Sequence, residues 1–97
     1  VNLSAYWIAH VTGHDPEQYR LYMDLSPEAF KAFNARFLAR GGEASTLEGQ
    51  HFVKHVLIEF DDYQSALACY QSDAYQRAKA QRAGVAEAQI VIVEGLA

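Results

Sequence analysis

The nine residues FVKHVLIEF, at positions 52–60, are rich in β-branched and aromatic side chains and predict a strand. Successive side chains of a strand point to opposite faces of its sheet. Apolar residues fall on both faces here: Phe52, Val56, Ile58 and Phe60 on one, Val53 and Leu57 on the other. A strand with this pattern is expected to be covered on both sides.

The strands predicted nearer the two ends of the chain show the same two-sided pattern. They are expected at residues 5–12 (AYWIAHVT) and 89–94 (QIVIVE). In the first, Tyr6 and Ile8 oppose Trp7, Ala9 and Val11; in the last, Ile90 and Ile92 oppose Val91 and Val93. An antiparallel sheet covered by helices on one side usually shows polar residues on the other, so the second apolar face needs its own cover.

A further strand is predicted at residues 37–40 and 43–47, interrupted by Gly41 and Gly42 and ending in a turn at 48–50. Glycine within a strand often marks a bulge or a close approach of backbone. A bulge would re-aim Arg40 and leave backbone N–H groups available to an anion or a carbonyl oxygen. The alternative is a bend of the sheet that fits a dimer and binds nothing.

Two helical regions separate these strands. Asp15 followed by Pro16 is a strong helix start, and the spacing of apolar residues continues past Pro27, where the helix is expected to kink or restart. The second helix is predicted from residue 61 to residue 82, with a bend capped by Ser72 and an end at Gly84.

The order β-α-β-β-α-β predicts an α+β fold of ferredoxin-like type, a single domain spanning residues 1–97. Its four-stranded antiparallel sheet would carry helices on one face. The apolar open face would meet the same face of a second copy, which gives a homodimer in the form of a dimeric α/β barrel.

Composition excludes several classes of protein. The net charge is −4, and the eight lysines and arginines are scattered, so no nucleic-acid surface and no polybasic membrane patch is expected. No apolar run approaches the ~20 residues of a membrane span, and no signal peptide is evident. We therefore expect a cytoplasmic protein. Cys69 is the only cysteine, so an internal disulfide is excluded.

Charged residues within the apolar strands are the first candidates for function. Glu59 stands in the run VLIEF, where a carboxylate is costly unless it is paired, and Arg40 on the neighbouring strand is the expected partner. This pair would form the polar corner of a pocket between helices and sheet. The alternatives are a structural ion pair and a strand end that faces water.

Acid–base chemistry is the enzymatic option that these residues favour. Glu59 or His10 in an apolar pocket would move a proton, while Arg40 or Arg82, with Tyr75, would hold a small carboxylate or enolate. No metal site and no cofactor is predicted, because histidines four apart on a strand are separated by about 13 Å. Cys69 is expected to be a buried, inert thiol.

Several separated motifs carry a family resemblance. ARGG followed by LEG, then VLIEF, CYQSDAYQRAKAQR and VIVEG, together with the opening AYWIAHVT, resemble the uncharacterised family called domain of unknown function 1330. The resemblance implies a dimeric α/β barrel and no agreed activity. The recurring positions that it carries over are Arg40, Gly41, Gly42, Glu48, Gly49, Glu59, Ser72, Tyr75, Arg82 and Glu94. The chain departs from the family pattern at Asp61–Asp62, where Pro-Ser is usual, and at Cys69, where Trp is common.

The function expected from these observations is binding of a small molecule by a dimeric barrel, with cofactor-free acid–base chemistry on a small organic acid or carbonyl compound. The alternative is a non-catalytic binding protein or a structural dimer. The candidate ligand-binding residues are Arg40, Gly41, Gly42, Ser72, Tyr75 and Arg82, and the catalytic ones Glu59 and His10. An enzyme is expected to bring them together at one cavity.

Overall fold

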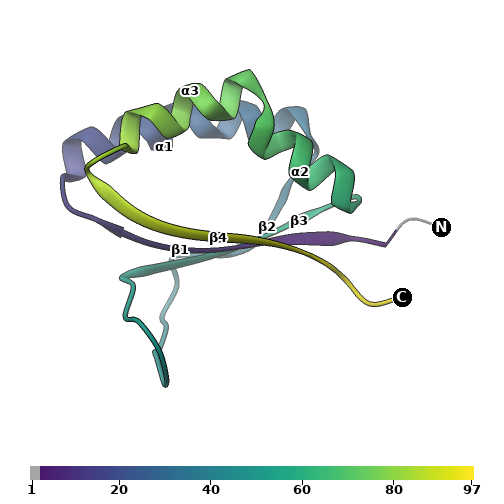
Figure 1. Cartoon of the computed structure of the whole chain (residues 1–97), viewed down its shortest axis with the longest axis horizontal. Helices are drawn as coiled ribbons and strands as arrows, with labels where there is room; N and C mark the ends of the chain where they lie inside the picture. Colours follow the sequence, from purple (N-terminus) through teal and green to yellow (C-terminus); the bar gives the residue numbers. More distant parts are fainter. Residues whose placement is uncertain (1–2) are drawn as a thin grey trace.

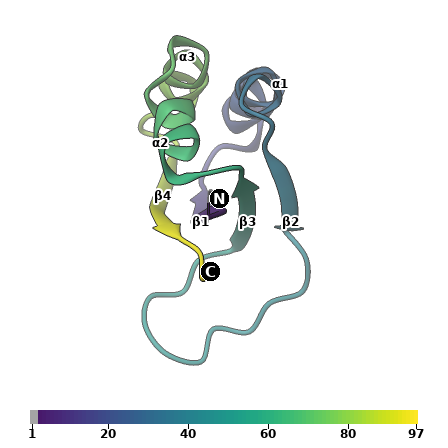
Figure 2. The same cartoon turned by 90° about the vertical axis from the view of Figure 1, so that its right-hand side faces the viewer.

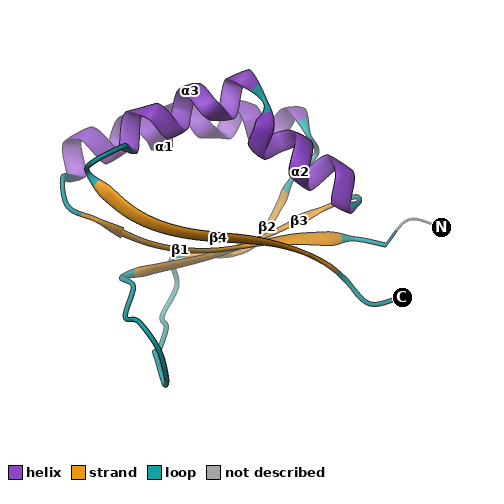
Figure 3. Ribbon diagram, viewed as in Figure 1, coloured by secondary structure: helices purple, strands orange, loops and turns teal. Residues whose placement is uncertain are grey.

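In a computed structural model, residues 3–97 are described and form a four-stranded antiparallel sheet covered by helices on one face (Figures 1 and 3). Residues 1 and 2 of the predicted domain lie outside this range. The elements are β1 (Ala5–Gly13), α1 (Pro16–Ala32), β2 (Arg36–Arg40), β3 (Lys54–Phe60), α2 (Tyr63–Gln71), α3 (Asp73–Arg82) and β4 (Ala86–Glu94). The strand order is β2-β3-β1-β4, which confirms the predicted ferredoxin-like arrangement.

The helices begin where the sequence predicts. The side chains of Asp15 and Asp62 each accept a hydrogen bond from a backbone N–H in the first turn, of α1 and α2 respectively. Ser72 ends α2 and caps α3, so the predicted bend divides the second helix in two. The predicted restart at Pro27 is wrong, because α1 continues through this residue as one helix. In Figure 2, α1 and α3 lie side by side above the sheet.

The face of the sheet below the helices holds the core. Trp7 of β1 is 1% exposed and packs against the rings of Phe30, Phe60, Tyr70 and Tyr75 at centroid distances of 5.1–5.8 Å. Its indole N–H donates to the carbonyl of Ala66 at 2.9 Å. The aromatic cluster therefore joins β1 to all three helices and to β3.

The opposite face of the sheet carries no helix among the described residues. Strand register places Ile8 of β1 between Leu57 of β3 and Val91 of β4, and Tyr6 between Glu59 and Val93. Val91 and Val93 are 49% and 44% exposed. We call this surface the open face; its apolar centre agrees with the two-sided pattern in the sequence.

The strand predicted at 43–47 is wrong. Residues 41–53 form a long loop that descends on the side of the open face (Figures 1 and 2). The predicted bulge at the glycines is also wrong, because the register shift lies between Phe37 and Ala39. Gly41 instead begins the loop with φ at 69°, a left-handed conformation that favours glycine, and its N–H donates to the carbonyl of His55.

Gly95 stands where the chain after β4 touches the segment before β1. A Cβ at this position would lie 2.9 Å from the ring of Tyr6 and 3.0 Å from the carbonyl oxygen of Ser4. We expect Gly95→Ala to lower the free energy of unfolding by about 1–3 kcal/mol, since backbone and ring must shift. Gly42→Ala, with nothing within 4 Å of the added methyl, is the matched control in the same urea titration. Equal midpoints for the two variants would contradict the prediction.

None of the helices within residues 3–97 is both long and apolar enough to cross a bilayer.

Candidate functional site

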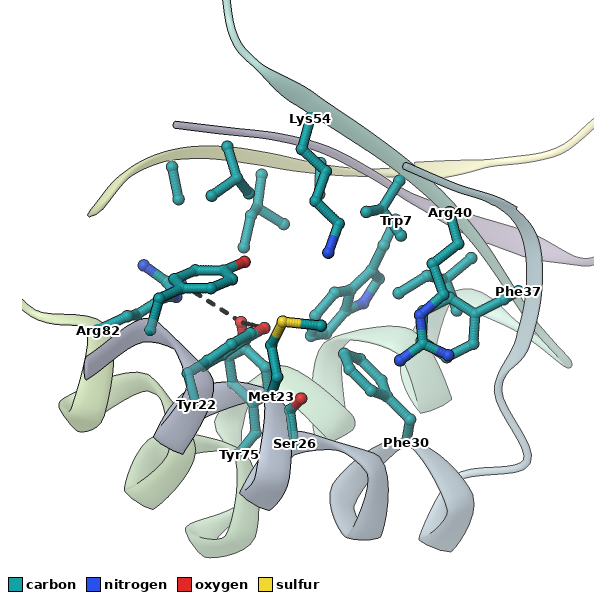
Figure 4. Close-up of a pocket in the computed structure, with 17 residues that line it drawn as sticks. Trp7, Tyr22, Met23, Ser26, Phe30, Phe37, Arg40, Lys54, Tyr75 and Arg82 are labelled. Atoms are coloured by element: carbon teal, nitrogen blue, oxygen red, sulfur yellow. Dashed lines mark hydrogen bonds between the residues drawn. The ribbon is translucent and has the colours of Figure 1, made fainter. Parts of the chain in front are cut away.

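A cavity of about 50 Å³ lies between the helices and the covered face of the sheet, and every strand together with α1 and α3 contributes to it (Figure 4). Its apolar wall includes Trp7, Phe30, Phe37, Val56, Ile58 and Ile90. Its polar groups come from Tyr19, Tyr22, Ser26, Arg40, Lys54, Tyr75 and Arg82. Three cations and three phenols thus line the cavity, while its lining contains no Asp or Glu.

Arg82 is the cation that the fold buries most deeply in this wall. It lies in the last turn of α3 and is 8% exposed. Its guanidinium donates to the Tyr75 hydroxyl at 3.3 Å and stacks over the Tyr22 ring at 5.2 Å. No carboxylate within residues 3–97 forms an ion pair with it. A buried charge without a counter-ion is costly, so this wall of the cavity favours an anion.

Two phenols accompany the arginine. The hydroxyls of Tyr22 and Tyr75 lie 2.9 Å apart, and one donates to the other. Burial, and then the neighbouring Tyr75, raise the pKa of Tyr22 far above that of a free phenol. Its hydroxyl therefore stays protonated at neutral pH and remains a hydrogen-bond donor or proton carrier.

The other two cations come from the sheet. Arg40 ends β2 at the exposed rim of the cavity, with its guanidinium 4.2 Å from the centroid of the Phe37 ring. Lys54 begins β3 and extends from the sheet toward the helices (Figure 4). Burial, and then the charge of Arg40, lower the pKa of Lys54. Both effects penalise the charged ammonium group.

A second hollow of about 200 Å³ adjoins this cavity. Val11, Tyr19 and Lys54 line both spaces, and the hollow is completed by Gly13, Pro16 and Val53. It lies where β1 turns into α1, opposite the end of the long loop. The three shared residues place the hollow directly beside the cavity.

The predicted pair between Arg40 and Glu59 is wrong. Glu59 is the Cα partner of Arg36, whose Nε donates to it at 3.1 Å, and the Tyr6 hydroxyl donates to it at 3.4 Å. Arg40 lies beside Val56, on the helix-covered face, whereas Glu59 lies on the open face. The alternation of side chains along β3 thus puts the two expected partners on opposite sides of the sheet.

Asp61 completes the network around Arg36. It accepts from the guanidinium at 2.9 Å and from the side-chain amide of Asn34 at 3.1 Å. The amide of Asn34, and then Arg36, lower the pKa of the Asp61 carboxyl. These contacts join the end of β3 to the start of β2 and give the Glu59 carboxylate a partner within the single chain.

His10 also lies on the open face. Its Nδ1 is 2.7 Å from Nδ1 of His55, its Cα partner across the strands. The pair lines a broad hollow with Phe52, Gln89 and residues 44–50 of the loop. In the part of the chain that the structure describes, no group of three His, Cys, Asp or Glu side chains is placed to hold a metal ion.

The remaining candidates lie outside the cavity lining. The hydroxyl of Ser72 accepts a hydrogen bond from the N–H of Tyr75 at 3.2 Å and donates one to the carbonyl of Cys69 at 2.7 Å. These are the contacts of a helix-capping residue. Gly41 and Gly42 belong to the start of the loop. Of the eight predicted site residues, the structure therefore brings Arg40, Tyr75 and Arg82 together at one cavity.

Four polar residues of the cavity were missed by the sequence analysis: Tyr19, Tyr22, Ser26 and Lys54. Lys54 carried a usable signal, because it shares the parity of Val56, Ile58 and Phe60 in the strand. The prediction that Phe52 lies on this same face is wrong, because Phe52 belongs to the loop and stacks on His10 at the open face. A lysine on the buried side of a strand predicts a polar cavity above it. Tyr19 and Tyr22 lie three residues apart in the first predicted helix, a spacing that places them on one face.

Cys69 lies in α2 and is fully buried, with its thiol 3.7 Å from the carbonyl of Ala29. Burial raises the pKa of this thiol to about 12, so the reactive thiolate is absent at neutral pH. We expect native protein to resist a disulfide-exchange reagent at pH 7.5 and urea-unfolded protein to react at once. Rapid labelling of the folded protein would contradict this burial.

Comparison with known proteins adds a family and a fold. A family model described as "Domain of unknown function (DUF1330)" matches residues 4–96. Among curated proteins, none matches the chain at a significant level.

Solved structures resemble the whole chain. A protein of unknown function from Rhodopseudomonas palustris is 14% identical, with a TM-score of 0.80 over 100% of this chain and 85% of that chain. SnoaB, a cofactor-independent oxygenase from Streptomyces nogalater, is 9% identical, with a TM-score of 0.65 over 98% and 95%. A dimeric ferredoxin-like protein of unknown function from Thermobifida fusca is 16% identical, with a TM-score of 0.65 over 96% and 92%. At these identities the likeness concerns the fold.

Proposed function

Because this chain belongs to the DUF1330 family, whose name specifies no activity, we propose its function from the cavity itself: it binds a small organic acid or carbonyl compound between helices and sheet. The observation that carries this proposal is Arg82, a buried guanidinium that faces the cavity and has no carboxylate partner among residues 3–97. A ligand carboxylate supplies the missing counter-ion, in a geometry that guanidinium groups favour.

The phenols give the same cavity the means for cofactor-free acid–base chemistry. Tyr75 is held between Tyr22 and Arg82, so its hydroxyl has a fixed direction and a proton partner at 2.9 Å. Such a pair stabilises an enolate oxygen or passes it a proton. That a structurally similar protein is a cofactor-independent oxygenase is in keeping with chemistry performed by side chains alone. Glu59 and His10 remain candidates for proton transfer only at the open face.

Titration with acetate, glycolate and pyruvate, followed by amide chemical shifts, tests the binding site. We expect saturable shifts for residues of α1, α3 and β3, and a loss of affinity of about tenfold or more in Arg82→Met, since one charge-assisted hydrogen bond contributes about 1.5–3 kcal/mol. Arg77→Met, on the exposed side of α3, is the matched control. Equal affinities for the two variants would show that Arg82 does not bind the ligand, and this would contradict the proposal.

The open face supports a second proposal, that the protein acts as a homodimer. Leu57, Ile8 and Val91 form an apolar row flanked by a Glu59–Tyr6 row and a His55–His10 row. A surface of this kind fits a second copy of itself, because twofold symmetry lets the apolar rows meet. One similar structure is that of a dimeric ferredoxin-like protein, which agrees with the same use of the sheet.

A further inference from the structure

Lys54 lines the cavity, and the binding of an anion does not use the reactivity of its amine. It lies on β3 at a position that faces the helices. In Figure 4 its side chain descends from the sheet into the cavity, and its nitrogen lies between Arg82 on one side and Arg40 on the other. The amine therefore faces the space in which a ligand would be held by its carboxylate.

The amino group of Lys54 is available for reaction. Within residues 3–97 it takes part in no hydrogen bond or ion pair, and the Tyr19 ring lies 5.9 Å from it. Burial and the charge of Arg40 lower the pKa of Lys54, which increases the fraction of neutral amine. A neutral amine in a partly desolvated site next to another cation is the form of lysine that attacks carbonyl carbon.

We propose that Lys54 forms an imine with a small 2-oxo acid whose carboxylate is held by the arginines of the cavity. This inference rests on the proposed binding of organic acids, and it adds the class of substrate and the group that attacks it. Arg82 and Arg40 supply the positive charge for the carboxylate. The amine of Lys54 faces the same space, so the carbonyl carbon that adjoins this carboxylate would lie near it.

The step is balanced without an oxidant or a reductant. The amine nitrogen attacks the carbonyl carbon, a C–N bond forms, and the C=O electron pair moves to oxygen. That oxygen takes up protons and departs as water, and nitrogen loses its protons as the C=N bond forms. The hydroxyls of Tyr22 and Tyr75 line the same cavity and can pass a proton to the departing oxygen.

The size of the cavity restricts the substrate. A water molecule needs about 10–15 Å³, so the cavity of about 50 Å³ holds roughly four non-hydrogen atoms. The adjoining hollow, at about 200 Å³, is larger and is open to the surface, so it leaves room for a longer tail on the ligand. The cavity itself therefore fits only the 2-oxo acid end of a ligand, and glyoxylate and pyruvate, which are little more than that end, are the probes.

Trapping with sodium cyanoborohydride tests the imine directly. The reagent delivers hydride to the imine carbon, a proton goes to nitrogen, and the linkage becomes a stable secondary amine that peptide mass spectrometry locates. The chain has only three lysines, Lys31, Lys54 and Lys79, so the other two serve as internal controls. With glyoxylate at pH 7 we expect Lys54 to be labelled about tenfold or more faster than Lys31, because the cavity holds the acid beside this amine and so raises its effective concentration.

Variants distinguish imine formation at Lys54 from the proposed binding of organic acids. Lys54→Arg keeps the charge but cannot form an imine, so it should lose the adduct and still bind acetate. Arg82→Met should slow labelling of Lys54 while Lys31 and Lys79 are unaffected. Labelling of the three lysines at equal rates, with acetate binding intact, overturns the imine and leaves anion binding standing. Failure of the wild-type protein to bind acetate as well overturns both.

Discussion

Replacing Trp7 by alanine is expected to lower the free energy of unfolding by about 3–5 kcal/mol, the usual cost of removing a buried tryptophan. Trp7 is 1% exposed and touches four other aromatic rings, so the space left behind cannot close without moving the helices. The hydrogen bond from its indole N–H to the carbonyl of Ala66 is lost as well. Domains of this size are stable by only about 5–15 kcal/mol, so much of the total is lost.

Differential scanning calorimetry measures this loss. For a domain of this length each kcal/mol corresponds to about 4–8 °C in Tm, so the shift is large. Tyr63→Ala removes another ring, but one that is 37% exposed at the start of α2, and it serves as the control. If the two variants melt within a few degrees of each other, the aromatic cluster does not hold this fold together.

The sheet was predicted well from the sequence because its strands carry apolar residues on both faces. Trp7 and Ile8 are neighbours that are both apolar, and so are Ile90 and Val91, which indicates strands whatever covers them. The second strand was predicted too long, because the residues after Gly42 have the composition of either a strand or a loop. Its end depends on Gly41 at positive φ and on its bond to His55, and neither is visible in one sequence.

The candidate site was predictable in part. Arg82 and Tyr75 are seven residues apart on one helix, so two full turns place them on the same side, and both were named. The partner of Glu59 was misjudged. Strand parity puts Glu59 on the face opposite to that of Val56 and Ile58, and this was not carried through to the choice of its partner. The partner is set by register, and Arg36 rather than Arg40 stands across from Glu59. Register depends on the bulge between Phe37 and Ala39, which no local pattern marks.

Leu57→Asp is expected to convert the proposed homodimer to a monomer. Leu57 has Ile8 as its Cα partner at the centre of the open face, so a carboxylate there would be buried between two apolar rows in the dimer. Removing such a charge from water costs several kcal/mol unless it is paired. Twofold symmetry repeats the cost in the second copy, and a total above about 4 kcal/mol weakens association roughly a thousandfold.

Sedimentation velocity at micromolar concentration distinguishes the outcomes, with the fluorescence of Trp7 as the check that each variant is folded. The control is Leu25→Asp, because Leu25 is 43% exposed on α1, on the helical side of the molecule. Wild type and Leu25→Asp should sediment as dimers and Leu57→Asp as a monomer. A dimer that survives Leu57→Asp would have to use some other surface. A wild-type monomer would mean that the apolar row of Leu57, Ile8 and Val91 stays exposed to water, which would contradict the proposed dimer.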